Sequence, residues 1–361
     1  MNNKRTIFIT GATGLVGSYL LKTLLLNGHK VYALARNRGS KSAEKRILEI
    51  LRFWDEKISI EKLRIVEGDI AKEALDLDEK TRKLLKNEIE EIFHAAAITD
   101  LNQPMAKMKK VNVEGTKNVL GLAKEFSKIV KINHISTAYI YGDYNGLFKE
   151  NDLDVGQKLN TNYEETKFRA EQLAEEYRKK GLWVDIYRPS IVVGDSKNGK
   201  TFQFKHIYQF INLCKLEIFD TLPILDAYVS LEPVDLLAEA IYTISINIKD
   251  KNRNYHPFPK KLIPVENIID IASELLNFKK PKIVSLGDFK IKGLTASQRA
   301  LLKNSILSVK LKKTLDSNYT NAILNKLNFS FPDVDNGLIA KMLKYFVSVG
   351  KQNRVRNEIN F

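Results

Sequence analysis

A glycine-rich turn near the N-terminus constrains the fold more than any other feature of the sequence. Residues 10–17 read TGATGLVG, after a short β-branched run at 5–10 and before apolar residues at helical spacing over 15–27. Strand, turn and helix in this order are typical of dinucleotide-binding folds, because glycines permit the tight turn and let the backbone approach a pyrophosphate. The helix N-terminus then faces the anion. The sequence therefore predicts a pyrophosphate site formed by Gly11, Thr13, Gly14, Leu15 and Gly17.

The rest of the N-terminal half alternates strand-like and helical segments. Apolar runs at 30–35, 63–66, 92–98, 129–135 and 183–187 are separated by helical patterns at 42–54, 107–126 and 163–180. This alternation predicts an α/β Rossmann fold with a doubly wound parallel sheet. After about Ser190 the alternation weakens and prolines accumulate. We therefore expect an NAD(P)-binding domain over 1–190 and a smaller, mainly helical substrate-binding region over 191–361, which can return one strand or more to the sheet.

Composition excludes several classes of protein. The single cysteine, Cys214, rules out an internal disulfide scaffold and a zinc finger, and we expect no metal site. No run reaches the roughly 18 apolar residues that span a bilayer. These observations predict a cytoplasmic protein with no transmembrane segment.

Positive charge is concentrated toward the C-terminus. The formal net charge is +15, and the last 83 residues hold 16 Lys and Arg against 5 Asp and Glu. Such a field attracts nucleic acid, an anionic membrane, or an acidic small molecule or protein, and charge alone does not choose among them. A solvated basic surface is the alternative interpretation.

The end of the second predicted strand indicates which dinucleotide binds. The residue at this position reads the adenosine ribose in such folds, and here it is Arg36. A guanidinium suits the 2′-phosphate of NADP, whereas a carboxylate would suit the 2′-hydroxyl of NAD. Arg36, helped by Arg38 and Lys41, therefore favours NADP, with a solvated basic loop as the alternative. Asp69 follows the third strand and is placed either to accept a bond from the adenine amino group or to form a simple turn.

A second group of residues predicts a carbonyl site. Tyr163 and Lys167 lie one turn apart on a predicted helix, so their side chains face the same way. The hydroxyl pair Ser136-Thr137 ends the strand at 129–135, at the sheet edge where this class of fold presents ligands. A phenol is a weak acid at neutral pH, and we expect the Lys167 ammonium to lower the Tyr163 pKa and to hold the nicotinamide ribose.

Several motifs in order carry a resemblance to a known superfamily. TGATGLVG, GDI at 68–70, HAAA at 94–97, VNVEGT at 111–116, STAYIYG at 136–142, NYEETK at 162–167 and YRPSIVVG at 187–194 resemble the extended short-chain dehydrogenase/reductases over roughly residues 5–200. A narrower resemblance is to the thioester reductase and fatty acyl reductase branch, the male-sterility type. Three segments carry it: the helix that follows the arginine-ended strand, the segment after GDI, and the motif STAYIYG. The resemblance also implies cofactor contacts from Ile70, Ala95, Ala96 and Pro189.

The resemblance implies a reaction and a set of catalytic residues. Counted back from the Tyr-Gly pair, the superfamily's active-site hydroxyl falls on Thr137, its acid on Tyr163 and its lysine on Lys167. In the branch it resembles, NADPH delivers hydride to an acyl thioester of CoA or of an acyl carrier protein. The product is an aldehyde, or an alcohol after a second reduction. The partners so implied are a thioester substrate and an acidic carrier protein rather than nucleic acid.

Two other functions share the same fold. A nucleotide-sugar epimerase or dehydratase returns its hydride to the substrate and usually keeps NAD bound, and Arg36 speaks against it. A sensor that binds NADP without catalysis is typical of members that have lost the tyrosine or the lysine, and both are present here.

Four further features have simpler explanations. Residues 194–201, GDSKNGKT, satisfy the P-loop pattern, but a nucleotide turn already opens the chain, so we expect a loop over the substrate where Lys197 or Lys200 meets a phosphopantetheine phosphate. His94 and His134 lie in apolar strands and are expected to be core residues. Cys214 is expected to be buried and unreactive.

Overall fold

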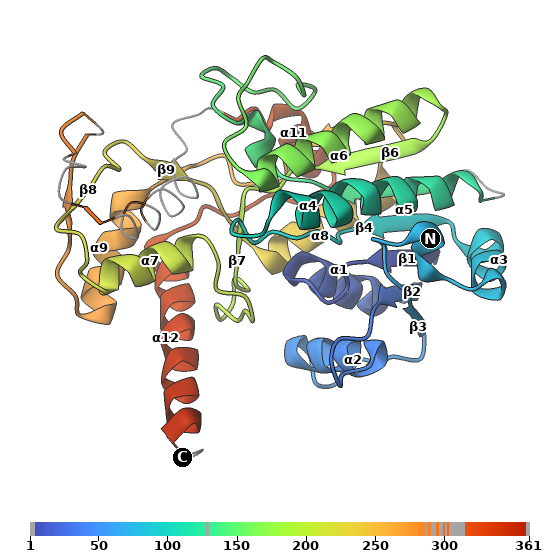
Figure 1. Cartoon of the computed structure of the whole chain (residues 1–361), viewed down its shortest axis with the longest axis horizontal. Coiled ribbons are helices and arrows are strands. Elements are labelled where there is room, and N and C mark those ends of the chain that lie inside the picture. The colour runs from blue at the N-terminus through green and yellow to red at the C-terminus, as the bar shows by residue number, and fades with distance from the viewer. Residues whose placement is uncertain are drawn as a thin grey trace. The chain divides into compact units, whose positions relative to one another are not determined.

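A seven-stranded parallel sheet organises the N-terminal half of the protein (Figure 1). The computed structural model describes residues 4–126, 130–285, 287–289, 294–295, 299, 302 and 315–358. The strand order is β11-β6-β5-β4-β1-β2-β3, with every neighbouring pair parallel. The strands are β1 (Thr6–Thr10), β2 (Lys30–Ala35), β3 (Leu63–Glu67), β4 (Glu91–His94), β5 (Lys131–Ile135), β6 (Trp183–Tyr187) and β11 (Asn254–Tyr255). The expected Rossmann fold is thereby confirmed.

Helices connect successive strands and cover both faces of this sheet. They are α1 (Leu15–Leu26), α2 (Ala43–Trp54), η1 (Glu73–Asp76), α3 (Glu79–Glu88), α4 (Met105–Met108), η2 (Lys109–Glu114), α5 (Gly115–Lys124), η3 (Ala138–Tyr141) and α6 (Asn162–Lys179). Several begin at residues whose side chains accept a bond from the first turn, as Ser42, Asp78 and Thr161 do. Capping of this kind fixes where each helix starts and therefore which side chains reach the sheet edge.

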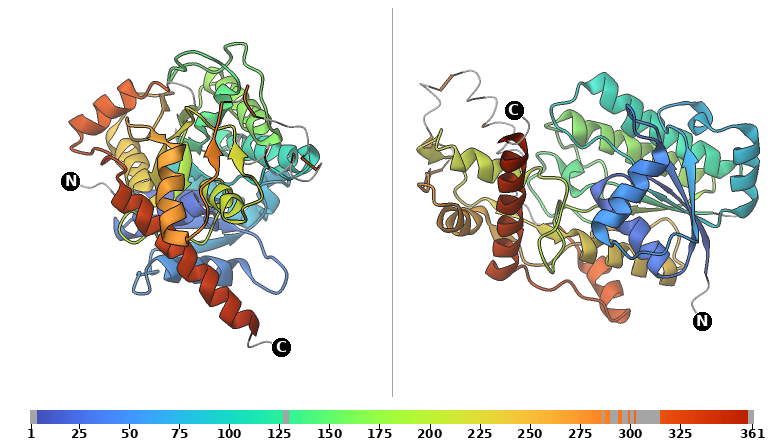
Figure 2. Two further views of the ribbon diagram at one scale, coloured as in Figure 1. Left: turned by 90° about the vertical axis from the view of Figure 1, so that its left-hand side faces the viewer. Right: turned by 90° about the horizontal axis from the view of Figure 1, so that it is seen from below.

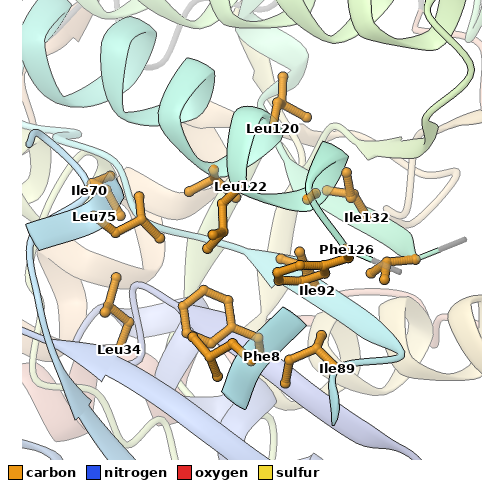
Figure 3. Packing of buried hydrophobic residues seen from close by; sticks show 14 of the residues in the cluster. Phe8, Leu34, Ile70, Leu75, Ile89, Ile92, Leu120, Leu122, Phe126 and Ile132 are labelled. Carbon is orange, nitrogen blue, oxygen red and sulfur yellow. The ribbon is translucent and has the colours of Figure 1, made fainter. Parts of the chain in front are cut away.

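The main hydrophobic core lies between the sheet and α5 (Figure 3). Phe8, Ile92 and Ile132 project from three adjacent strands toward Leu122 of α5, and Leu120 of the same helix belongs to the same cluster. All five side chains are at most 3% exposed. Because helices cover both faces, these strands read as continuous apolar runs rather than as alternating ones.

The chain divides into two compact units, and it passes between them several times. The first unit comprises Met1–Pro189, Leu237–Pro257 and Leu315–Ser330, and the second comprises Ser190–Leu236, Phe258–Thr314 and Phe331–Phe361. The expected division near residue 190 falls at the first crossing, and two later segments return to the first unit. One of them supplies β11, which pairs with β6, and the other supplies α11 (Asn318–Lys326).

The second unit contains short strands and helices. Its two-stranded sheets pair β7 (Ile191–Val193) with β10 (Leu231–Pro233), β9 (Tyr228–Val229) with β12 (Ile263–Pro264), and β8 (Thr221–Leu222) with β13 (Lys282–Ile283). The helices are α7 (Ile207–Lys215), the start of α8 (Val234–Asn247), α9 (Val265–Leu276) and α12 (Asn336–Glu358). α12 packs against α9, beside which it is seen in Figure 2. Within the described part of the chain, no helix is long and apolar enough to cross a membrane.

A left-handed turn follows β3. Ala74, Leu75 and Asp76 have φ values of 50°, 60° and 59°, a conformation that costs an L-residue roughly 1–2 kcal/mol. The turn brings the Leu75 carbonyl oxygen to 2.9 Å from the Asp69 amide. At Gly68, an added Cβ would lie only 2.5 Å from the same oxygen. Backbone strain in η1 therefore accompanies the close packing of the segment that carries Asp69.

Replacing Ala74 by glycine is expected to stabilise the protein. Ala74→Gly relieves strain of roughly 1–2 kcal/mol and loses part of that to chain entropy, which leaves a gain of up to about 1 kcal/mol. The matched control is Ala322→Gly on the exposed face of α11, which should lose roughly 1 kcal/mol. Chemical denaturation measures both free energies of unfolding. Equal destabilisation by the two substitutions would show that the turn is unstrained.

Candidate active site

The glycine turn between β1 and α1 leaves no room for side chains. Gly11 has a φ of +75°, and a Cβ there would lie 2.4 Å from the Ala96 amide nitrogen. A Cβ on Gly17 would lie 2.2 Å from the Gly11 carbonyl oxygen. Gly14, at the N-cap of α1, offers no side-chain cap. The expected contacts Gly11, Gly17, Ala95 and Ala96 are thus brought together, and an anion can approach the first turn of α1 directly.

An arginine that the sequence motifs do not reveal, Arg46, contacts this turn and lies near Arg36 and Arg38. Arg46 of α2 donates from Nη2 to Thr13 Oγ1 at 3.3 Å and from Nη1 to the Arg36 carbonyl oxygen. Burial, followed by repulsion from Arg38 and Arg36, lowers the pKa of Arg46. Such a concentration of positive charge next to the turn suits a phosphate group. Arg46 could have been found from the Ser42 cap, because that cap places it on the second turn of α2.

Asp69 has partners of its own in this structure. One carboxylate oxygen pairs with Arg36 Nη1 at 3.2 Å, and the other accepts the Ala71 amide at 3.0 Å. The second bond is that of a turn aspartate, which was the alternative interpretation of this residue. Ile70, expected beside the cofactor, is 6% exposed and lies in the hydrophobic core, where it packs against Gly115.

Thr137, Tyr163 and Lys167 converge at the carboxyl end of β5. Thr137 follows β5 and is 3% exposed, and its side chain forms a hydrogen bond with that of Tyr163. Lys167, one turn further along α6, is 2% exposed and donates from Nζ to the Ile135 carbonyl oxygen at 2.8 Å. Pro189 closes the group, because its carbonyl oxygen accepts the Ala138 amide at 2.8 Å. The three expected catalytic side chains therefore form one cluster.

Burial controls the ionisation of this cluster. It raises the pKa of Tyr163 to about 12, although the hydrogen bond with Thr137 acts in the opposite direction. It also lowers the pKa of Lys167 to about 8, against the opposing charge of Glu171. The expectation that Lys167 lowers the Tyr163 pKa is wrong for this structure, because desolvation is the largest effect on the phenol. Tyr163 is therefore a neutral proton donor at physiological pH.

Asn112 is a further residue that the sequence analysis did not single out. It lies in η2, a π-helical turn between α4 and α5, and it is 1% exposed. Its side chain accepts the Ile98 amide at 2.7 Å and donates to the Ile98 carbonyl and to Thr166 Oγ1, both at 3.0 Å. Asn112 thus joins the segment after β4 to α6 next to Lys167. Its motif, VNVEGT, was recognised, but only the structure shows this bond pattern.

An ion pair inside the first unit anchors the same helix. Arg188 and Glu171 are both fully buried, and Arg188 Nη2 lies 2.7 Å from Glu171 Oε2. Arg188 also donates from Nη1 to the Glu150 carbonyl oxygen at 3.0 Å. The pair fixes the segment before Pro189 against α6, one turn from Lys167. Breaking a buried pair of this kind typically costs roughly 3–5 kcal/mol.

The P-loop pattern at 194–201 does not form a P-loop. Its amides turn inward: Gly199 donates to the Asp195 carbonyl oxygen at 2.7 Å, and Asp195 donates to that of Lys200 at 3.0 Å. The next helix along the chain, α7, begins only at Ile207, so no helix follows the loop directly as one does in a P-loop. Lys197 is exposed and Lys200 is half-buried, and their contact with a phosphopantetheine phosphate stays a prediction.

The two histidines and Cys214 are buried as expected. His94 is 1% exposed and forms hydrogen bonds with Thr10 and Thr116, and burial lowers its pKa to about 3. Burial raises the pKa of Cys214 to about 12, which leaves the thiol protonated and unreactive. Among the described residues, no group of three or more His, Cys, Asp or Glu side chains could hold a metal ion.

Much of the basic C-terminal stretch is outside the described side chains. The basic residues concerned are Lys290, Lys292, Lys303, Lys310, Lys312, Lys313, Lys351, Arg354 and Arg356. The interpretation of this charge therefore stays a prediction.

The chain is similar in sequence to a family of known proteins and to several individual members. The family model described as male sterility protein matches residues 9–241. One of the subunits of the linear gramicidin synthase of Brevibacillus parabrevis is 26% identical over 98% of this chain, and the L-2-aminoadipate reductase large subunit of Penicillium chrysogenum is 29% identical over 67%. The chain spans only 7% and 18% of the lengths of these two relatives.

Solved structures agree with the sequence relatives. The terminal R domain from the myxalamid PKS-NRPS biosynthetic pathway superposes with a TM-score of 0.83 at 26% identity, covering 97% of this chain and 92% of that domain. MoeE5 in complex with UDP-glucose and NAD has the same fold, with a TM-score of 0.66 at 17% identity over 95% of this chain and 99% of that chain. The family match covers more than half of the sequence and the sheet has the corresponding topology. The chain therefore belongs to the male sterility protein family, within the extended short-chain dehydrogenase/reductase fold.

Proposed function

We propose that this protein is an NADPH-dependent reductase that converts an acyl thioester of CoA or of a carrier protein to an aldehyde or an alcohol. The observation that carries the proposal is the cluster of buried Thr137 and Lys167 with half-buried Tyr163, at the same sheet edge as the glycine turn. Relatives named as L-2-aminoadipate reductases, and a putative fatty acyl-CoA reductase of Drosophila melanogaster, 31% identical over 38% of this chain and 28% of the relative, support this choice.

The residues of the first unit fit a phosphorylated dinucleotide. Gly11, Gly14 and Gly17 form a turn with no space for side chains, at the N-terminus of an uncapped helix. Arg46 contacts both Thr13 in that turn and the Arg36 backbone, and these two arginines would hold the 2′-phosphate. Lys167 would hold the nicotinamide ribose. The cofactor, when bound, supplies the hydride.

The chain's own groups would handle the substrate oxygen and its proton. Thr137 and Tyr163 donate hydrogen bonds to the thioester carbonyl oxygen, and they stabilise the negative charge that develops there as hydride adds to the carbon. Tyr163 gives its phenolic proton to this oxygen, which forms a hemithioacetal. The hydroxyl proton then passes to the Tyr163 phenolate as the carbon–sulfur bond breaks, which forms an aldehyde. The sulfur leaves as a thiolate and takes up a proton from water to give the thiol. The proposed reduction of that aldehyde would use a second NADPH and repeat the hydride and proton transfers.

The form in which the substrate arrives follows from its chemistry. CoA and the phosphopantetheine arm both carry phosphate, and a carrier protein is acidic, so the basic stretch over 279–361 would attract either. A structural neighbour described as a thiolation-reductase di-domain, with a TM-score of 0.79 at 19% identity, has the same fold over 97% of this chain and 76% of that chain.

A substrate panel tests the proposed function. Purified protein is supplied with NADPH or NADH and with acyl-CoA, acyl carrier and sugar-nucleotide substrates, and the absorbance of the reduced cofactor is followed. Consumption of NADPH with acyl thioesters supports the proposal. Conversion of a sugar nucleotide without net consumption would establish an epimerase instead, and cofactor binding without turnover would establish a sensor.

Removal of the Tyr163 hydroxyl should abolish most of the turnover. Tyr163→Phe is expected to lower kcat about 10²–10⁴-fold, the usual effect of losing a positioned proton donor, and to leave the affinity for NADPH nearly unchanged. The matched control is Tyr177→Phe, the same change about 21 Å further along α6, which should retain wild-type turnover. Near-normal turnover of Tyr163→Phe would remove this residue from the mechanism.

Arg46 should contribute to the choice of cofactor. Arg46→Ala is expected to lower kcat/KM for NADPH roughly 10–100-fold, because a charge-assisted bond to phosphate is worth about 1.5–3 kcal/mol, and to leave kcat/KM for NADH nearly unchanged. Arg52→Ala, an exposed arginine of the same helix, serves as the control. Equal losses with both cofactors would contradict a contact with the 2′-phosphate.

A further inference from the structure

Among the described residues, the buried imidazole of His134 in β5 has no hydrogen-bond partner. It is 1% exposed, and neither ring nitrogen has a partner among the described residues. Buried polar side chains in folded proteins are almost always bonded to protein or to ordered water, so an orphaned imidazole requires an explanation. His134 lies in register with His94 on one side and with Ile186 on the other.

The neighbouring ring cannot satisfy His134. The ring centroids of His94 and His134 are 5.2 Å apart, and both nitrogens of His94 are already used. Thr116 donates its hydroxyl proton to the Asn112 carbonyl oxygen at 2.6 Å and so accepts from His94 Nε2. Because His94 is neutral, its Nδ1 then accepts from Thr10 at 2.7 Å. This leaves no proton on His94 for His134.

The Lys167 ammonium is a hydrogen-bond donor near the His134 ring. The side chain reaches from α6 to the carbonyl oxygen of Ile135, the residue after His134, and this is the one bond that its buried ammonium makes to a described residue. An ammonium has three protons to donate. Ser136 Oγ is also buried and unbonded among the described residues, and strand alternation puts residues 134 and 136 on one face. The Lys167 ammonium therefore contacts the backbone between His134 and Ser136, two residues whose buried polar atoms have no partner among the described residues.

We propose that an internal water molecule bridges Lys167 Nζ, His134 and Ser136 Oγ, and that His134 is thereby a positioning residue for Lys167. Three polar partners are the usual number for a buried water. The ring of His134 is neutral, because burial and the nearby Lys167 charge lower its pKa well below the ordinary value, and it can therefore accept a hydrogen bond. The catalytic consequence rests on the proposed function, but the water site does not.

The bridging water should favour the charged form of Lys167. Burial already lowers the Lys167 pKa, and the opposing charge is Glu171, which is paired with Arg188. Of the groups near His134, the His94 ring is neutral, and Arg178 lies close enough for its charge to act on His134. Loss of the imidazole acceptor removes a solvating group from the ammonium, so the Lys167 pKa must fall further.

Titration of the lysine carbons by NMR tests this directly in the free protein. The Lys167 signal, assigned by its loss in Lys167→Arg, is expected to titrate near 8 in the wild type. His134→Leu should lower this pKa by about one unit, the effect of losing a hydrogen bond to a charged group, and His134→Asn, which keeps an acceptor, should restore most of it. Ile186→Val, the neighbour in register, is the packing control and should leave the pKa unchanged. Equal pKa values in His134→Leu and the wild type would overturn the proposal.

Two further measurements keep the proposal independent of protein stability and of the proposed reaction. A crystal structure of the wild type should show ordered water bonded to both His134 and Lys167 Nζ, and a dry site would contradict the proposal even if no variant folds. In the reductase assay, kcat/KM of the wild type should fall above about pH 8, because Lys167 then loses its proton. This fall should move to lower pH in His134→Leu but not in Ile186→Val. A shifted Lys167 pKa without reduction of any thioester would refute the proposed function and support the water site.

Discussion

The close approach of the glycine turn to the segment after β4 determines how the rest of the first unit is built. With a Cβ on Gly11 only 2.4 Å from the Ala96 nitrogen, no side chain fits between β1 and its neighbour at this edge. The absence of side chains leaves the N-terminus of α1 facing the carboxyl ends of the strands. Arg36 and Ala95 directly follow β2 and β4, Thr137 lies two residues past the end of β5, and Tyr163 lies in the first turn of α6. The parallel sheet therefore gathers them at one edge.

Burial then decides what these groups can do. Desolvation disfavours the charged form of a side chain, so it raises the pKa of Tyr163, which stays protonated, and lowers the pKa of Lys167. A neutral phenol suits a site that must donate one proton, and the Lys167 ammonium on the same helix favours the phenolate that this donation leaves. The buried Glu171–Arg188 pair and the hydrogen bonds of Asn112 to Ile98 and Thr166 hold α6 in place. They thereby fix the distance between the Tyr163 phenol and Thr137. The network costs desolvation, and its benefit is position rather than stability.

Much of this arrangement follows from local patterns in the sequence. The glycine turn, the alternating strands and helices, and the i, i+4 spacing of Tyr163 and Lys167 rest on short-range geometry, and the structure places these elements where the sequence predicts them. Contacts between distant segments could not be predicted in this way. Arg46 reaches Thr13 across 33 positions, and α11 returns to the first unit long after residue 190. The direction of the Tyr163 pKa shift was also missed, because it depends on burial, which spacing does not reveal.

The central claim is that hydride passes from the reduced cofactor to the carbonyl carbon of an acyl thioester, and isotope transfer measures this most directly. NADPH deuterated on the transferred position of the nicotinamide is incubated with the protein and an acyl-CoA or acyl-carrier substrate, and the products are analysed by mass spectrometry. The account predicts deuterium on the carbonyl carbon of the aldehyde, or on the corresponding carbon of the alcohol. Products without deuterium, or a sugar nucleotide that is epimerised while the label stays in the cofactor, would contradict it.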